Sequence, residues 1–274
     1  MANLYVRALH VHPVKSVAGT APDEVAVEPW GLSGDRRWAL VDAGGAVITQ
    51  RQQPRLALAA ARPTGDGGIA VSAPGMAGLV VEVPGPGPLE PVLLFGKKVE
   101  TVAAASAAAD WFSDYLGVPA RLVHLDDPAV RRPVDPAYAL PGETVSLADG
   151  YPLLLTTDAS LDALNSLIAQ GDHPEEGPVP MNRFRPNVVV SGAEAWAEDG
   201  WGRLAIGDAV FRGARECSRC IVTTTDQSTA RRGKEPLATL ARHRRIGKSL
   251  AFGRQLVPVR LGTVRVGDEV RVLG

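Results

Sequence analysis

Both cysteines of this 274-residue chain lie close together, at Cys217 and Cys220. A thiolate is the softest metal ligand that a protein offers, and it is also a redox-active nucleophile. Four kinds of site therefore fit this pair: half of a zinc site, a thiol–disulfide redox couple, a structural disulfide, or a single thiolate ligand to a cofactor that the protein binds. Two ordinary thiols without a chemical role are the simpler alternative.

The surrounding sequence does not favour zinc or a redox couple. A structural zinc site needs four ligands, usually with a second Cys or His pair at a matching spacing. Of the histidines, only His10 and His12 lie near each other, and they are far from the cysteines in sequence. A thioredoxin-type couple usually opens a helix, whereas the β-branched run that follows Cys220 predicts a strand over 220–225. Zinc stays open as an alternative, because remote residues can meet in a fold.

Three short polar clusters place cations beside expected strand ends. Lys15 and Ser16 follow a strand expected over 4–12, and Arg36 precedes one expected over 37–42. The third cluster directly precedes an apolar run and reads Asn182-Arg183-Phe184-Arg185-Pro186-Asn187. A single arginine at a strand end is usually a solvated surface residue. Three clusters and a candidate thiolate together indicate a cationic site for an anionic cofactor, because guanidinium and ammonium groups bind phosphate well.

Length and composition are those of an ordinary globular protein. Hydrophobic residues make up 45% and charged residues 22% of the sequence, and the formal net charge is −1. A nearly neutral chain has no global field that would attract nucleic acid or an anionic membrane. The N-terminus lacks a signal-peptide pattern, and no window approaches the roughly 18 apolar residues of a spanning helix. Since two cysteines do not indicate a secreted disulfide framework, we expect a cytoplasmic protein with no membrane or nucleic-acid partner.

Short strands and turn glycines dominate the predicted secondary structure. Helices are predicted over 104–116 and 161–168, with Ser160 as the N-cap of the second. The pattern predicts a β-rich α+β fold, with an N-terminal β-barrel over residues 1–120 packed on a second β-barrel with a few helices over residues 121–274. We expect the cofactor in the cleft between the two units, because ligand pockets often form at domain interfaces.

The sequence around Cys220 resembles a known family. The motifs Cys-Ser-Arg-Cys-Ile-x-Thr-Thr-x-Asp and Lys-Glu-Pro-Leu-x-Thr-Leu, within residues 217–240, are similar to the molybdenum cofactor sulfurase C-terminal (MOSC) domain. The likeness is to the branch that holds the mitochondrial amidoxime-reducing component and its bacterial relatives. Phe184-Arg185-Pro186-Asn187 fits the same family. The family's N-terminal β-barrel domain is resembled by Pro13-Val14-Lys15-Ser16, Asp35-Arg36-x-Trp38 and Arg51-Gln52-x-Pro54-Arg55-Leu56, so the resemblance covers nearly the whole chain.

This resemblance implies that the protein binds the molybdenum cofactor (Mo-molybdopterin) and that Cys220 is its ligand to the metal. The implied activity is the reduction of small N-oxygenated compounds, such as amidoximes and hydroxylamines, by oxygen-atom transfer. Arg215 and Arg219, beside the thiol, are expected to favour its thiolate form. The residues at the family's cofactor-binding positions are Lys15, Ser16, Arg36, Arg185, Asn187 and Cys220.

Some features depart from the family pattern. Gly150 and Tyr151 stand where the mitochondrial enzymes have a Thr-Ser pair, and Arg37 replaces an aromatic residue. No cysteines remain for an iron–sulfur domain, so a separate electron-donor protein of the ferredoxin, flavodoxin or cytochrome type is implied, together with its reductase. The candidate docking face for that donor is Arg231, Arg232, Lys234, Arg242, Arg244 and Arg245, although a solvated run of surface charges is the more common explanation of such a stretch. The alternative function is a non-catalytic cofactor carrier, or a protein that transfers sulfur from a persulfide of Cys220.

Overall fold

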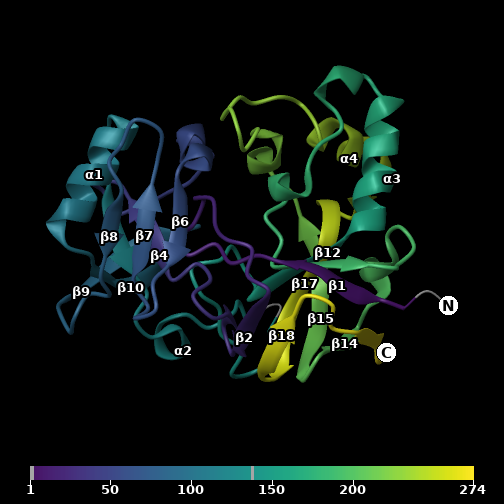
Figure 1. The fold of residues 1–274 in the computed structure, drawn as a ribbon, viewed down its shortest axis with the longest axis horizontal. Coiled ribbons are helices and arrows are strands. Elements are labelled where there is room, and N and C mark those ends of the chain that lie inside the picture. The colour runs from purple at the N-terminus through teal and green to yellow at the C-terminus, as the bar shows by residue number, and fades with distance from the viewer. Residues whose placement is uncertain (1–2, 137–138) are drawn as a thin grey trace.

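Two β-rich units lie side by side in the structure, a computed structural model that describes residues 3–136 and 139–274. Figure 1 shows the first half of the chain forming most of one unit and the second half forming most of the other. The described residues contain four α-helices, and the strands form barrel-like sheets. The β-rich α+β fold predicted from the sequence is therefore confirmed. No helix in the described part of the chain is both long and apolar enough to cross a membrane.

The N-terminal unit is built from two small sheets and one covering helix. The first sheet contains β4 (Trp38–Val41), β5 (Val47–Ile48), β9 (Leu89–Leu94), β10 (Lys97–Ala103) and β11 (Arg121–His124), in the order β5-β4-β11-β10-β9. The second contains β6 (Ala60–Pro63), β7 (Ile69–Ser72) and β8 (Leu79–Val81). Helix α1 (Ser106–Leu116) buries Trp111, Phe112 and Tyr115 in a core that includes Trp38 and Leu40. This apolar stripe explains why the predicted helix forms, although it begins two residues later than the prediction of 104.

The C-terminal unit is dominated by one large sheet. Its strands are β1 (Tyr5–Leu9), β12 (Leu153–Thr157), β13 (Val188–Ser191), β14 (Arg203–Ile206), β15 (Ala209–Ser218), β17 (Ser249–Arg260) and β19 (Val270–Val272), in the order β1-β13-β12-β17-β15-β14-β19. The short β16 (Arg245–Ile246) pairs with β17. Helices α3 (Asp158–Ala169) and α4 (Leu237–His243) pack on this unit, while the single turn α2 (Pro128–Arg131) follows β11.

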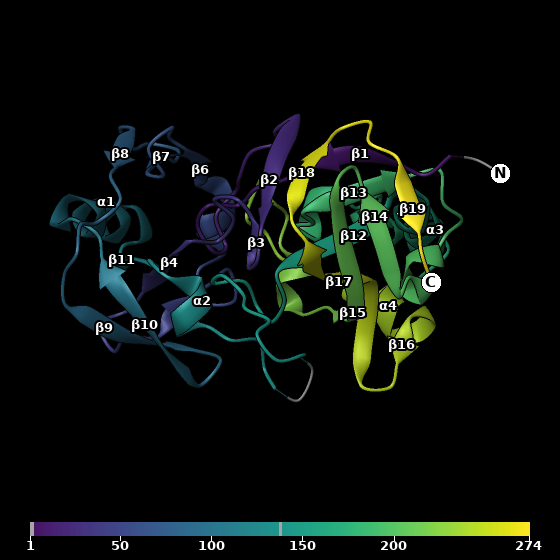
Figure 2. The ribbon, with the colours of Figure 1, turned by 90° about the horizontal axis from the view of Figure 1, so that it is seen from below.

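The two units share strands across the chain. β1, the first strand, belongs to the large sheet of the C-terminal unit, where it pairs with β13. A small sheet joins β2 (Glu24–Glu28) and β3 (Gly31–Leu32) to β18 (Gly262–Arg265), and Figure 2 shows it next to the large sheet. β11 conversely returns to the sheet of the N-terminal unit. The domain boundary at residue 120 stays a prediction, since strands on each side of it lie in the other unit.

Two local predictions are wrong. Residues 220–225 do not form a strand, because Ile221–Thr224 is a 3₁₀ helix with Cys220 at its N-cap. The hydroxyl groups of Thr223 and Thr224 each donate to the carbonyl oxygen three residues earlier, at 2.9 Å, which favours a turn over an extended chain. The helix predicted over 161–168 begins at Asp158, and its N-cap is Thr157, which accepts from the backbone N–H of Ser160.

Candidate cofactor site

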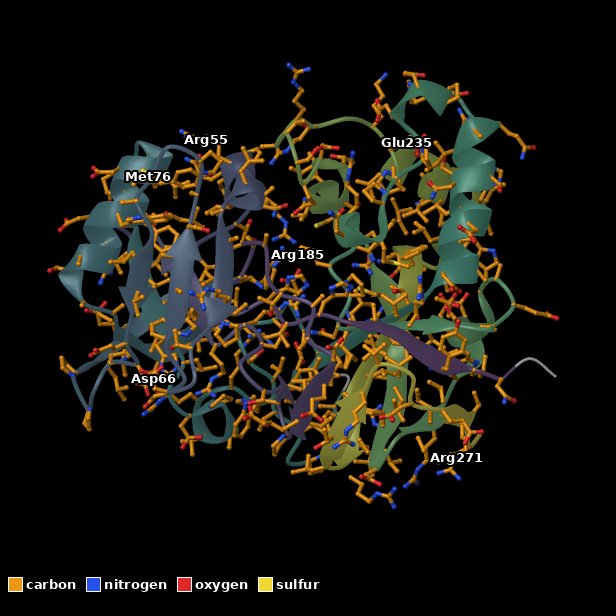
Figure 3. All side chains as sticks on the ribbon, viewed as in Figure 1. Arg55, Asp66, Met76, Arg185, Glu235 and Arg271 are labelled. Atoms are coloured by element: carbon orange, nitrogen blue, oxygen red, sulfur yellow. The ribbon has the colours of Figure 1, made fainter. Side chains whose placement is uncertain are left out.

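The structure places all six predicted site residues in one cleft between the two units. Lys15, Ser16 and Arg36 come from the first part of the chain, and Arg185, Asn187 and Cys220 come from the second. In Figure 3, Arg185 lies at the junction of the two units. Each residue lies in a loop at a strand end: after β1, before β4, before β13 or after β15. The six predicted residues therefore lie together in the cleft between the units, where we expected the cofactor from the sequence.

Three of these residues have an unusual backbone conformation. Ser16, Arg36 and Arg185 have φ angles of 67°, 49° and 53°, in the left-handed region that residues other than glycine rarely adopt. Such residues cluster at ligand sites, where the surrounding structure holds them in place. The side chain of Gln50, fully buried, holds the first of these turns by donating to the Ser16 carbonyl oxygen at 2.8 Å.

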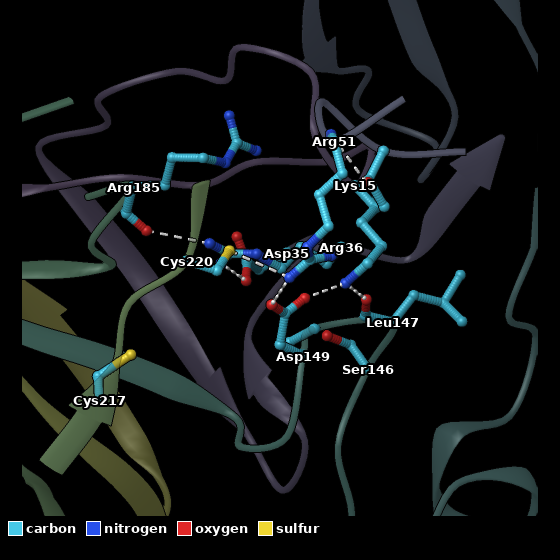
Figure 4. Close-up of polar contacts among 12 residues, drawn as sticks. Lys15, Asp35, Arg36, Arg51, Ser146, Leu147, Asp149, Arg185, Cys217 and Cys220 are labelled. Atoms are coloured by element: carbon cyan, nitrogen blue, oxygen red, sulfur yellow. Dashed lines mark hydrogen bonds and ion pairs between the residues drawn. The ribbon is translucent and has the colours of Figure 1, made fainter. Parts of the chain in front are cut away.

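The Arg36 guanidinium joins the two units at the floor of the cleft (Figure 4). It donates to the carboxylate of Asp35 at 2.5 Å, to the side-chain oxygen of Asn187 at 3.2 Å and to the carbonyl oxygen of Arg185 at 3.0 Å. Asn187 in turn donates to the carbonyl oxygen of His10 at 3.2 Å. Arg36 and Asn187 thus fix the backbone that presents Arg185, which stabilises the shape of the cleft.

Lys15 is a buried cation on one wall of the cleft. Its Nζ donates to the Asp149 carboxylate at 2.5 Å and to the Leu147 carbonyl oxygen at 2.8 Å. Burial lowers the pKa of Lys15 to about 8, although the charge of Asp149 opposes this change. The Asp149 side chain, by contrast, is 59% exposed. Partial burial would raise the pKa of Asp149, but Lys15 and Arg51 outweigh it and hold this pKa well below its usual range, so the carboxylate is charged at neutral pH.

The cation that contacts the Cys220 thiol is Arg51. Its Nη2 lies 3.2 Å from Cys220 Sγ and 3.5 Å from an Asp149 carboxylate oxygen. The Arg215 and Arg219 side chains, which were expected to assist the thiol, form other contacts. Arg215 pairs with Glu216 at 3.1 Å. The Arg219 guanidinium donates to the carbonyl oxygens of Phe252 and Phe184, at 2.9 and 3.2 Å, and lies over the Phe184 ring.

Charge in the cleft is strongly one-sided. The lining carboxylate is Asp149, whereas the lining cations are Lys15, Arg36, Arg51, Arg183, Arg185 and Arg219. Burial, reinforced by the neighbouring Arg36, lowers the pKa of Arg185 to about 9. Two buried guanidinium nitrogens, Nε of Arg183 and Nη2 of Arg219, have no hydrogen-bond partner among the residues that the structure describes. These are the features expected of a site that is completed by an anionic ligand.

Cys217 has different surroundings from Cys220. Its side chain is buried, and its Sγ accepts from Nε2 of Gln255 at 3.0 Å. Burial raises the pKa of this thiol. Figure 4 shows Cys220 close to Arg51, with Cys217 farther from the cationic group. The two thiols are thus chemically distinct, and Cys220 is the one placed among the cations.

The other interpretations of the cysteine pair gain no support. Both cysteines are free thiols in the structure. Within residues 3–136 and 139–274, the metal-ligating side chains that gather closely enough to share an ion are His173, Glu175 and Glu176, and neither cysteine belongs to that group.

Sequence reasoning assigned no role to Arg51, Asp149 or Arg183. Arg51 stands within a motif that carried the family resemblance, and Asp149 directly precedes the Gly150-Tyr151 departure, so both positions were visible in the sequence. Arg183 donates to the Thr224 carbonyl oxygen at 3.1 Å and pairs with Asp226 at 2.9 Å, which ties down the loop after Cys220. Only the three-dimensional contacts reveal these roles.

The two β-rich units correspond to two domains of one known protein family. Residues 3–119 match the MOSC N-terminal beta barrel domain, and residues 142–271 match the MOSC domain. The chain belongs to this family.

The chain is similar to several proteins over nearly its whole length. It is 35% identical to "Mitochondrial amidoxime-reducing component 1" of Homo sapiens, over 98% of this chain and 83% of that protein. It is 33% identical to "Mitochondrial amidoxime reducing component 2" of Rattus norvegicus, over 97% of this chain and 82% of that protein. It is also 29% identical to "Molybdenum cofactor sulfurase" of Oryza sativa subsp. japonica, over 92% of this chain but 32% of that longer protein. The names of these relatives refer to amidoxime reduction and to the molybdenum cofactor.

Proposed function

We propose that this protein is a molybdenum-cofactor enzyme that reduces N-hydroxylated compounds. The observation that carries the proposal is a thiol, Cys220, inside a cleft whose side chains are predominantly cationic. Molybdopterin carries a phosphate and sulfur donors, so it needs such a cradle, and a soft metal prefers a thiolate. The unpartnered guanidinium nitrogens of Arg183 and Arg219 fit the same ligand. The names of the relatives support this choice over other anionic cofactors.

The roles of individual residues follow from their contacts. Cys220 would hold the molybdenum, while Lys15, Ser16, Arg36 and Arg185 would surround the phosphate and pterin, with Asn187 supporting them. When bound, the cofactor supplies the two-electron chemistry that removes the oxygen atom from the substrate. The net reaction of an amidoxime breaks its N–O bond and gives an amidine and water, consuming two electrons from an external donor and two protons from solvent.

Residues of the chain itself position the thiol and hold charge for the cofactor. Arg51 restrains Cys220 through its 3.2 Å contact with Sγ. Lys15 keeps a proton on Nζ at pH 7 next to the exposed Asp149 carboxylate, so its positive charge is available to the phosphate of the cofactor.

A cavity beside the cleft favours an enzyme over a cofactor carrier. A carrier needs to bind only the cofactor, whereas a reductase needs space for a substrate next to it. A cavity of about 420 Å³ shares Asp149, Gly150 and Tyr151 with the cleft. The proposed substrate is therefore a small N-oxygenated compound, and the carrier or sulfur-transfer function is kept as the alternative.

Electrons would come from a separate donor protein with its reductase. Of the candidate docking residues, Arg232 binds backbone oxygens of Gln50 and Arg51, Arg242 pairs with Asp172, and Arg244 pairs with Asp199. The docking face that we propose is therefore narrower than the one predicted from the sequence. Of the six candidate docking residues, Arg231, Lys234 and Arg245 have exposed side chains without a hydrogen bond or ion pair to another described residue. The cytoplasmic location stays a prediction from the sequence.

Cysteine variants test the proposal. Purified wild type should contain molybdenum and phosphorus by elemental analysis, and should reduce an amidoxime with reduced viologen as the electron donor. Cys220→Ser should lose both molybdenum and turnover, because a hydroxyl is a harder and far less acidic ligand than a thiol. Cys217→Ser is the matched control and should keep most of both. Full activity in Cys220→Ser would disprove the ligand assignment, and a molybdenum-loaded wild type that reduces no N-hydroxylated compound would favour the carrier.

A further inference from the structure

The cavity next to the cofactor cleft has walls from both units. One wall is the β9–β10 hairpin, including Leu94, Phe95 and Val99, and another is the segment 131–136. The wall nearest the cleft is formed by residues 149–151, which line both spaces. A molecule in this cavity would thus meet the cofactor cleft at Asp149.

The shared wall is held firmly from both sides. From the cavity side, Arg132 donates to the carbonyl oxygens of Ser146 and Ala148, the latter at 2.9 Å. From the cleft side, Lys15 Nζ donates to the carbonyl oxygen of Leu147 at 2.8 Å. The buried Lys15 and the half-buried Arg132 therefore fix consecutive carbonyl groups, and this stabilises the position of Asp149 between the two spaces.

Phe95 connects the cavity to the thiol. This residue is 54% exposed and lies at the hairpin tip, with a φ of 52°. The centroid of its ring lies 5.4 Å from Lys15 Nζ and 5.1 Å from the guanidinium carbon of Arg51, and Arg51 contacts Cys220 Sγ at 3.2 Å. The Phe95 ring and the Arg51 guanidinium thus form a chain of contacts from the cavity to the thiol.

The lining of the cavity combines apolar surface with excess positive charge. Its apolar residues include Leu94, Phe95, Val99, Val134 and Val145. Its carboxylates are Asp135 and Asp149, and its cations are Lys97, Lys98, Arg131, Arg132 and Arg215.

Most of these cations already have partners. Lys97 pairs with Asp135 at 2.6 Å, and Arg131 pairs with Asp126 at 2.6 Å. Lys98 is exposed and forms no ion pair with another described residue. It is the lining cation best placed to receive an anionic group from a ligand.

We propose that this cavity binds the body of the substrate and selects N-hydroxylated compounds that have a flat apolar body and an anionic group remote from the N–O bond. The flat body lies against Phe95 and the apolar walls, the N-hydroxylated end points past Asp149 into the cofactor cleft, and Lys98 receives the anionic group. The reacting group in this inference rests on the proposed function, whereas the choice of an acidic, apolar body rests on the cavity itself.

Steady-state turnover with reduced viologen measures the charge preference. The substrates are benzamidoxime, its 4-carboxylate derivative and its 4-trimethylammonium derivative. The carboxylate should have a KM about threefold below that of the parent compound, and the cation a KM above it, as expected for one partly exposed ion pair. Lys98→Glu should reverse this order at unchanged molybdenum content. Lys248→Glu, which makes the same charge change in the β16–β17 turn, should preserve it.

A binding measurement tests the cavity without any turnover. 4-Carboxybenzamide and benzamide have the same shape but no reducible N–O bond, and their dissociation constants are measured by calorimetry on the cofactor-loaded protein. 4-Carboxybenzamide should bind about threefold more tightly to wild type than to Lys98→Glu. Phe95→Ala should weaken both ligands several-fold, while Leu93→Ala, on the same hairpin but outside the cavity lining, should not.

The two assays separate this inference from the proposed function. Loss of turnover with every amidoxime would refute the reductase, while the binding constants would still decide whether the cavity selects acidic, apolar ligands. Equal binding of 4-carboxybenzamide and benzamide, unaffected by Lys98→Glu and by Phe95→Ala, would overturn the inference even in an active enzyme.

Discussion

Replacing Lys15 by methionine should stabilise the cofactor-free protein while abolishing cofactor binding. Burial lowers the pKa of Lys15 from 10.5 to about 8, and its side chain is 5% exposed. A difference of about 2.5 in pKa corresponds to about 3 kcal/mol, which folding spends on keeping this lysine charged at pH 7. Methionine fills a similar volume without a charge. The hydrogen bond to the Leu147 carbonyl oxygen is lost, at a cost of about 1 kcal/mol.

The expected net effect of Lys15→Met at pH 7 is a gain of about 2 kcal/mol in the free energy of unfolding. For a protein of this size, that raises the melting temperature by about 4–8 °C. The gain should depend on pH in a defined direction. Between about pH 8 and 10.5 the unfolded lysine holds its proton while the folded one has lost it, so the wild type becomes more stable with rising pH and the difference disappears.

Thermal unfolding of cofactor-free protein at pH 7 and 9.5 checks this prediction. Lys248→Met, at an exposed lysine, is the control and should change the free energy of unfolding by no more than about 0.5 kcal/mol. Cofactor retention after gel filtration gives the second readout, and Lys15→Met should lose its phosphorus and molybdenum. A Lys15→Met protein that is less stable than wild type at pH 7, or that gains the same free energy of unfolding over wild type at both pH values, would refute the reasoning.

Three further predictions concern the surroundings of the cleft. Asp226→Asn should lower the melting temperature by about 3–6 °C at pH 7, since it leaves the buried Arg183 without its charge partner. Hydrogen bonds, led by that of the Ser228 hydroxyl, hold the pKa of Asp226 well below its usual range, so the wild type should remain more stable than the variant at pH 4. Glu198→Gln should stabilise the protein by about 1 kcal/mol at pH 8 and by less at pH 5. Burial raises the pKa of Glu198, so its carboxylate becomes charged and destabilises the fold as the pH rises. Thermal unfolding at the two pH values measures this difference. With an acidic protein donor, turnover should fall when salt is added and when the charges of Arg231, Lys234 and Arg245 are reversed, while turnover with reduced viologen should change little. Donor-driven rates that change neither with salt nor with charge reversal would exclude docking at these three residues.

The motifs around the cleft were readable from the sequence because each is a local pattern of residue types. Lys15, Arg36 and Arg185 each stand at a strand end, and the structure brings them together with Cys220. The role of Arg51 was not readable, because a contact across 169 positions of the chain leaves no local signal.

The strand predicted after Cys220 failed for a different reason. Its β-branched residues favour extended backbone in general, but the hydroxyls of Thr223 and Thr224 bond to nearby carbonyl oxygens and stabilise a 3₁₀ turn instead. The strand exchange between units was equally hidden, since nothing in residues 5–9 indicates that they pair with residues 188–191 rather than with a neighbouring strand.

The pairing of the first strands with the last ones has a consequence for synthesis on the ribosome. β1 can pair only after β13 has been made, and β2 pairs with β18, whose last residue is Arg265. The turn that carries Lys15 and Ser16 lies between β1 and β2, so it reaches its final position only when almost the whole chain has emerged. The five-stranded sheet of the N-terminal unit lies entirely within residues 38–124, so it can form much earlier. Cofactor insertion must therefore follow translation, and a ribosome-bound chain that stops before residue 262 should have no binding site for the cofactor.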